Sequence, residues 1–181
     1  MVDHGYIRSG KYRRKFDLIS ENTTLNRLLY QLAKKMLFHR SGTLYEDMYW
    51  INPETLKIVA KETNQNVEKG ILYSDQTKKM ICKYERLITL HSHPNSFPPS
   101  IADLISNYEN NYEIGIVICH DGGIYLYRVN EKIEKKYYEL TVADYLNQGY
   151  NDIEAQRLAL NELMEKFDME CKEVREYGVC E

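Results

Sequence analysis

The chain has 181 residues, 43% of them hydrophobic and 28% charged, values typical of a folded globular protein rather than a disordered or fibrous one. Its formal net charge of −3 at pH 7 provides no general positive field for a polyanion, so nucleic acid is not the expected partner. Without an apolar run of roughly 20 residues or an apolar signal segment, the sequence predicts a soluble, cytoplasmic protein with reduced cysteines and no membrane partner.

The N-terminal residues 1–21 are polar and basic without a clear period, which favours a solvated arm. An amphipathic helix follows, because apolar residues recur every three or four positions from Leu25 to Leu37. A polar residue at 22–24 can cap its start, and Gly42 can end it.

The next part of the chain alternates β-rich runs with short helices. Residues 45–52 and 56–63 flank an Asn-Pro-Glu-Thr turn and predict an antiparallel pair of strands. Ser74 and Ser100 each stand where a short helix is expected to begin, with a buried strand at 87–91 between them.

Two further strands, 114–120 and 124–129, flank an Asp-Gly-Gly hairpin turn. Cys119 and His120 end the first of them, where we expect a core cysteine and a turn-side histidine. The order of elements predicts an α/β (α+β) fold, in which helices flank a mixed sheet.

After about residue 140 the pattern changes, and residues 153–174 are predicted to form one long helix. Its apolar positions from Leu160 to Val174 alternate spacings of four and three, so the helix either packs on its own domain or forms a homodimer seam. The expected organisation is an arm at 1–21, a main domain at 22–140 and a helical extension at 141–181.

The segment most informative about chemistry is HSHPNSFPPSIAD, residues 91–103. His91 and His93 are two positions apart at a strand end, so both imidazoles face one side of the sheet. Ser100 and Asp103 share one face of a helix N-terminus, and the proline-rich loop can fold them over the histidines. Two histidines and a carboxylate leave a fourth position open, the pattern of a catalytic zinc, although spacing alone does not separate zinc from iron.

The runs HSHP at 91–94 and SIAD at 100–103 resemble the HxHP…SxxD signature of the JAMM (MPN+/JAB) zinc metalloproteases. Six residues separate the second histidine from the serine, one fewer than in the commonest form, which indicates a divergent prokaryotic or phage-like branch near the RadC-like proteins. The resemblance covers about residues 45–130 and implies an MPN/JAB-like sheet.

The resemblance also implies roles for single residues. His91, His93 and Asp103 would hold Zn²⁺, and Ser100 would donate a hydrogen bond to the tetrahedral oxyanion. In the family a glycine often stands where this chain has Tyr49, which predicts crowding near the substrate groove.

The family uses a glutamate on an early strand as general base on the metal-bound water and then as proton donor to the leaving amine. Glu46 lies 45 residues before His91 (91 − 46), within the expected distance. Glu54, Glu62 and Glu68 are the alternatives, and each of them is otherwise expected to be a surface charge.

The implied activity is zinc-dependent hydrolysis of a peptide or isopeptide bond. Ubiquitin-like tails or conjugates are among the implied substrates, and such a tail is expected to lie along the edge from Glu62 to Tyr73. Two alternatives belong to other classes of protein: a non-catalytic, metal-bearing binding or assembly module of a phage- or toxin-associated kind, and a DNA-linked protein, against which the charge of −3 counts.

Overall fold

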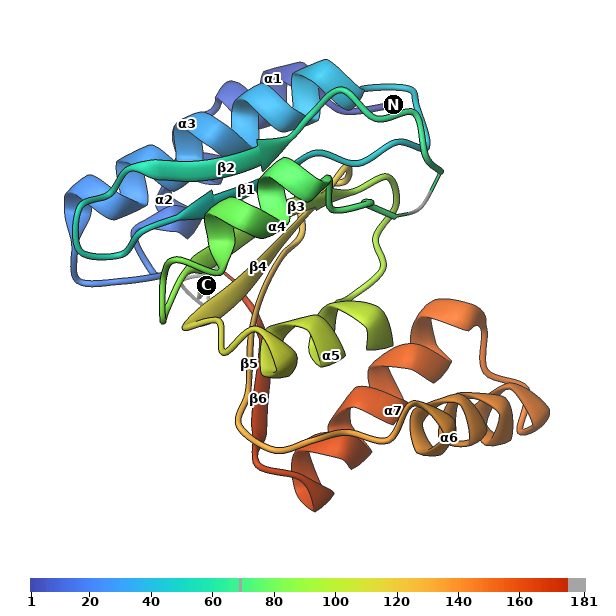
Figure 1. Cartoon of the computed structure of the whole chain (residues 1–181). Coiled ribbons are helices and arrows are strands. Elements are labelled where there is room, and N and C mark those ends of the chain that lie inside the picture. Colours follow the sequence, from blue (N-terminus) through green and yellow to red (C-terminus); the bar gives the residue numbers. More distant parts are fainter. Residues whose placement is uncertain (69, 176–181) are drawn as a thin grey trace.

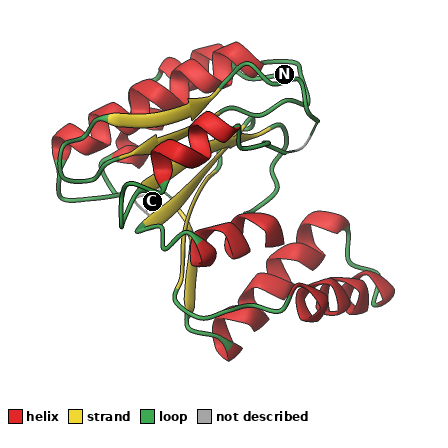
Figure 2. Cartoon of the chain, in the orientation of Figure 1, coloured by secondary structure: helices red, strands yellow, loops and turns green. Residues whose placement is uncertain are grey.

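The computed structural model describes residues 1–68 and 70–175, in which helices cover both faces of a mixed sheet (Figures 1 and 2). The helices are α1 (His4–Arg8), α2 (Gly10–Phe16), α3 (Thr23–Arg40), α4 (Asp75–Ile81), α5 (Ile101–Glu109), α6 (Lys135–Asn147) and α7 (Asp152–Lys166). The strands are β1 (Met48–Ile51), β2 (Ile58–Glu62), β3 (Ile88–His93), β4 (Ile114–Cys119), β5 (Ile124–Val129) and β6 (Met169–Glu173). The mixed α/β fold expected from the sequence is therefore confirmed.

The six strands lie in the order β2-β1-β3-β4-β5-β6. The central pair, β3 and β4, is parallel, and the other neighbours are antiparallel. Because parallel strands end at the same edge of a sheet, His93 at the end of β3 lies beside Cys119 at the end of β4. The middle of this edge is where the histidine-rich segment leaves the sheet.

The two faces of the sheet are covered differently (Figure 1). Helices α1, α2 and α3 cover one face, where Leu29, Met36 and Leu90 are among the fully buried core residues. Helices α4, α5 and α7 cover the other face, in two smaller apolar clusters. His91 pairs in register with Val117, which belongs to this second face, so the metal-binding candidates lie on the side of α5.

The predicted helix of the first apolar stripe is confirmed as α3. The side chain of Asn22 caps it by accepting hydrogen bonds from the backbone N–H groups of Thr24 (3.0 Å) and Leu25 (3.1 Å). His39 and Arg40 form the last turn, where positive charge complements the helix dipole.

The N-terminal segment is not the solvated arm expected for residues 1–21. It forms α1 and α2, with Ser9 as the N-cap of α2, and Ile7, Tyr12 and Phe16 are buried in the core beneath α3. The break between two short helices explains why the sequence shows no single period.

The C-terminal segment is the second departure from the sequence prediction. The helix expected at 153–174 ends at Lys166, and the chain returns as β6, which pairs with β5 at the edge of the main sheet. The expected boundary after residue 140 falls inside α6. Leu160 is buried in the chain's own core, whereas association into a homodimer remains a prediction.

Among the described residues, no helix is both long and apolar enough to cross a membrane. Cys82, Cys119 and Cys171 are free thiols, consistent with the expectation of reduced cysteines, and Cys180 lies outside the described residues.

Candidate metal centre

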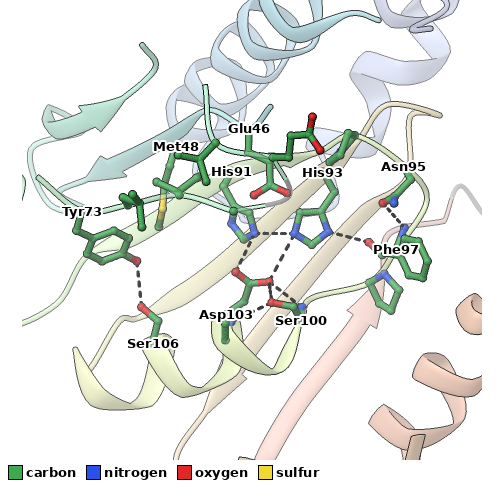
Figure 3. Close-up of a pocket in the computed structure, with 18 of the residues that line it drawn as sticks. Glu46, Met48, Tyr73, His91, His93, Asn95, Phe97, Ser100, Asp103 and Ser106 are labelled. Carbon is green, nitrogen blue, oxygen red and sulfur yellow. Dashed lines mark hydrogen bonds and ion pairs between the residues drawn. The ribbon is translucent and has the colours of Figure 1, made fainter. Parts of the chain in front are cut away.

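Three side chains from two elements converge at the end of β3. His91 and His93 project from the last residues of that strand, and Asp103 projects from the first turn of α5 (Figure 3). The two Nε2 atoms are 3.1 Å apart, and Asp103 places Oδ1 3.3 Å from Nε2 of His91 and Oδ2 3.5 Å from Nε2 of His93.

These separations match the geometry of a metal site. Zinc bonds of about 2.0–2.1 Å in a tetrahedron place neighbouring ligand atoms about 3.3–3.4 Å apart. The two Nε2 atoms are 3.1 Å apart, each lies 3.3 or 3.5 Å from a different oxygen of Asp103, and one ligand atom from each of the three residues lies within 4.8 Å of the other two. The donor set of two imidazole nitrogens and one carboxylate is also one that zinc accepts. The three side chains therefore offer a donor set and a spacing that fit a divalent cation.

The tautomer of His93 suits this arrangement. Its Nδ1 lies 3.1 Å from the backbone carbonyl oxygen of Phe97, to which it can donate a hydrogen bond. That bond places the lone pair on Nε2, the nitrogen that faces the cluster, and carbonyl partners of this kind orient many metal-binding histidines. Nδ1 of His91 is buried and has no hydrogen-bond partner among the described residues.

The pKa values of Asp103 and His93 are shifted by the charges around them. Burial raises the pKa of Asp103, but the two imidazoles outweigh it and hold that pKa well below its usual value. Burial lowers the pKa of His93, but the carboxylates of Asp103 and Glu46 outweigh it and raise that pKa. The cluster thus keeps a negative carboxylate beside two imidazoles, a charge arrangement that favours a cation at its centre.

Ser100 is the N-cap of α5 and forms a capping box with Asp103. Its hydroxyl donates to Oδ2 of Asp103 at 2.6 Å, and its backbone N–H donates to the same oxygen at 2.7 Å. The serine thus holds the carboxylate in place. To donate to an oxyanion, as the resemblance implies, its hydroxyl would have to turn away from Asp103.

Glu46 stands two residues before the start of β1 and lies on the opposite side of the two imidazoles from Asp103 and Ser100 (Figure 3). It is buried, with 8% of its surface exposed. Burial raises the pKa of this carboxyl, while the charges of His93 and His91 act to lower it. A carboxylate with a raised pKa is a better proton acceptor, which suits a general base.

The other glutamates have different surroundings. Glu54 is exposed in the turn after β1, and the carboxylate of Glu62 accepts hydrogen bonds from Ser74 and Thr77 at the start of α4. Glu68 lines the same cleft as Glu46 but is exposed. Of the four candidates, Glu46 is the buried one beside the histidines.

Tyr49 does not crowd the cleft. It pairs with Leu90, so its side chain faces α3 and is buried in that core. The prediction of crowding from the missing glycine is therefore wrong, because alternation along β1 turns position 49 away from the face that carries His91.

The cluster opens into a cleft of about 560 Å³. One side is an extended segment, residues 67–68 and 70–73, which we call the cleft wall. The hydroxyls of Tyr73 and Ser106 are 3.0 Å apart and connect this wall to α5 at one end of the cleft (Figure 3). Gln156, from α7, also lines the cleft.

A buried ion pair behind the cleft was not anticipated from the sequence. Nε of Arg40 donates to Oδ1 of Asp47 at 2.5 Å, and both side chains are almost fully buried. Nδ1 of His39 lies 2.8 Å from the other oxygen of Asp47. The backbone of Asp47 exchanges two hydrogen bonds, each of 3.0 Å, with Ser92, which stands between the two histidines. The ion pair therefore fixes the segment that carries Glu46 against β3, the strand that carries His91 and His93.

The same arginine also holds the cleft wall. Its guanidinium donates to the backbone carbonyls of Thr63 (2.8 Å) and Gln65 (3.0 Å). The amide side chain of Gln65 in turn bonds both backbone groups of Leu72 in the wall. The sequence carries little signal of this role, because an arginine at a helix C-terminus is already explained by the helix dipole.

Cys119 is fully buried, as expected. His120 lies in the turn after β4, as expected, but it is buried, and its Nε2 has no hydrogen-bond partner among the described residues. Neither belongs to the metal-binding group that the described residues form.

The structure brings Glu46, His91, His93, Ser100 and Asp103 into one site, as the sequence predicts. Comparison of the chain with family models, curated proteins and solved structures found no match.

Proposed function

We propose that this chain is a JAMM-type, zinc-dependent peptidase or isopeptidase. The observation that carries the proposal is the convergence of His91, His93 and Asp103, whose ligand atoms lie within 4.8 Å of one another, in an open cleft that also contains the buried Glu46. A closed structural zinc site would have a fourth protein ligand, and the fourth position here opens to the cleft instead.

A bound zinc ion would polarise the scissile carbonyl and lower the pKa of a water molecule towards about 7. Glu46 accepts the proton of the attacking water and passes it to the departing nitrogen. Its burial supports this role, because a raised pKa brings the carboxyl closer to the pH at which it must both take and release a proton. Ser100 holds Asp103 in position through the capping box.

The shape and exposure of the cleft wall favour a protein or peptide as the substrate. Its extended backbone includes a bridge between Tyr45 and Glu68, and an extended tail can pair with such a segment by β-augmentation. Leu72 of this wall is 65% exposed, which leaves apolar surface for the substrate to cover. A ubiquitin-like tail, narrow and extended, is the substrate class that we propose.

The non-catalytic metal-bearing module is the alternative with an observation in its favour. In this structure the Ser100 hydroxyl bonds Asp103, so it is not aimed at a substrate oxyanion. Retention of a buried glutamate beside the ligands favours the enzyme, because a binding module has no need of a proton acceptor there.

The first test is the metal content of protein purified without chelator. We expect about one zinc per chain in the wild type and in a His4→Ala control, and none in His91→Ala/His93→Ala. Absence of metal from the wild type after zinc is added would overturn the proposal.

The second test separates enzyme from binding module. Glu46→Gln should keep zinc but lower the hydrolysis of ubiquitin-like tails roughly 100- to 10,000-fold, the usual contribution of a general base. Glu54→Gln is the matched control, because it removes an exposed glutamate outside the cleft and should leave turnover near the wild-type rate. Undiminished turnover in Glu46→Gln would remove this residue as the base.

A further inference from the structure

The C-terminal helix α7 extends the cleft beyond the metal-binding residues. Gln156 lines the cleft itself, and the next residue, Arg157, lines an adjoining hollow of about 380 Å³. Pro98, in the loop between the histidines and α5, borders both spaces. A chain that crosses the metal-binding residues and continues past Pro98 therefore reaches Arg157.

The register of the strands gives the distance between His91 and Tyr125, the residue that Arg157 contacts. His91 on β3 pairs with Val117 on β4, which pairs with Tyr125 on β5, so the three side chains share one face of the sheet. Neighbouring strands are about 4.8 Å apart, which puts the Cα atom of Tyr125 roughly 10 Å from that of His91. Because Val117 between them is fully buried, a peptide passes above it, beside Pro98, and an extended chain needs about three residues or more to cover this distance.

Arg157 is held in place at the Tyr125 end of these three side chains. Its Nη2 donates to the hydroxyl of Tyr125 at 2.8 Å, and the tyrosine ring is buried. A guanidinium has five donors in a planar fork, and the phenol leaves others available to a carboxylate.

Among the described residues that line the hollow, two arginines, Arg157 and Arg175, face one carboxylate, that of Glu173. Glu173 is paired with Arg175 at 2.7 Å. The hydrogen bond to Tyr125 and the charges of this carboxylate and of Asp121 raise the pKa of Arg157, which keeps this guanidinium positive. The hollow thus combines a fixed cation, a position in line with the cleft and room for a small side chain.

We propose that the hollow at Arg157 is a substrate subsite for a carboxylate about three residues from the scissile bond. The carboxylate belongs either to an aspartate or glutamate side chain or to the end of the peptide chain. The proposal rests on the proposed function in one respect, that a peptide lies across His91. It gives α7 a role in substrate selection.

The test measures binding rather than turnover. Zinc-loaded Glu46→Gln protein is immobilised, randomised short peptides are passed over it, and the retained peptides are sequenced. We expect carboxylates to be enriched roughly fivefold at one position, the effect of a charge-assisted hydrogen bond at a partly exposed site. Libraries with free and with amidated C-termini distinguish the two sources, because enrichment of acidic side chains persists after amidation and capture of a chain end does not.

Three variants on the same background decide the assignment. Arg157→Gln should abolish the enrichment, and Tyr125→Phe should weaken it by releasing the guanidinium. Arg27→Gln removes an equal charge from α3, on the opposite face of the sheet, and should leave the enrichment intact. The same peptide profile in Arg157→Gln, or no retained peptides at all, would overturn the subsite.

The outcome is independent of hydrolysis. An Arg157-dependent carboxylate preference in a chain whose wild type cuts nothing would keep the subsite and reject the enzyme. Turnover of tails without that preference would keep the enzyme and reject the subsite.

Discussion

Two aspartates on opposite faces of β3, one buried and one partly buried, differ in the positive groups that face them. Asp47, on the side of α3, is 1% exposed, and the chain itself supplies its cation in Arg40. Asp103, whose side chain is 21% exposed, instead faces Nε2 of two imidazoles at 3.3 and 3.5 Å. The chain's own guanidinium neutralises the carboxylate of Asp47, whereas Asp103 and the two histidines have the donor atoms of a cation site.

The difference separates a structural ion pair from the cluster that we propose as a metal site. A buried carboxylate needs a partner, and a built-in guanidinium provides one at all times. Imidazoles provide positive charge only when protonated, and as neutral groups they offer lone pairs to a metal. The Asp47 pair therefore belongs to the scaffold, and the Asp103 cluster is arranged to bind.

The largest effect is expected from breaking the scaffold pair. Arg40→Met leaves Asp47 as a buried charge without its guanidinium and should lower the free energy of unfolding by about 3–5 kcal/mol, measured by urea denaturation. Arg40→Met/Asp47→Asn removes both charges and should be less destabilised than the single variant.

The matched control is Arg86→Met. Arg86 forms an exposed ion pair with Glu113 at 3.7 Å, so its loss should cost less than about 1 kcal/mol. Equal stability losses in the two single variants would mean that burial does not distinguish the pairs.

The second effect concerns the cluster. Zinc at a hundred times its dissociation constant should stabilise the wild type by about 2.7 kcal/mol. Asp103→Asn should lose this stabilisation, because it removes the charged ligand, while Asp47→Asn should lower the stability without zinc yet keep the response to it. Differential scanning calorimetry with and without zinc measures both quantities, and a full zinc response in Asp103→Asn would contradict the ligand assignment.

The sequence predicts the cluster better than the scaffold pair because the cluster is local. His91 and His93 share a face by strand alternation, and Ser100 and Asp103 share one by helix geometry, so a short segment defines most of the site. Arg40, by contrast, reaches Thr63 and Gln65, more than 20 residues away in the chain, through contacts that exist only in the folded state.

The ends of the chain also adopt structures that the local sequence pattern does not predict. Met169–Glu173 continues a helical spacing in the sequence, yet pairing with β5 makes it a strand, because tertiary contacts override a weak local preference. At the N-terminus, Ile7 and Phe16 are core residues of two separate short helices, so no single period reveals them.

The smallest expected effect concerns His120, a third buried ionisable group to compare with the two aspartates. It lies near the cluster, because its backbone N–H donates to the backbone carbonyl of His93. Burial and the nearby N-terminal amine lower the pKa of His120 to about 4. Below its unfolded pKa of about 6.5 the unfolded chain binds a proton that the folded chain excludes. Stability from this group is therefore present above pH 6.5 and is lost as the pH falls towards about 4.

The experiment is urea denaturation of the wild type and His120→Gln at pH 7 and pH 5. Between these pH values the free energy of unfolding should fall by about 1 kcal/mol less in His120→Gln than in the wild type, after discounting for solvent screening. An equal loss in both proteins would mean that this imidazole is protonated in the folded state, which would place a third cation source beside the cluster and weaken the contrast between the two aspartates.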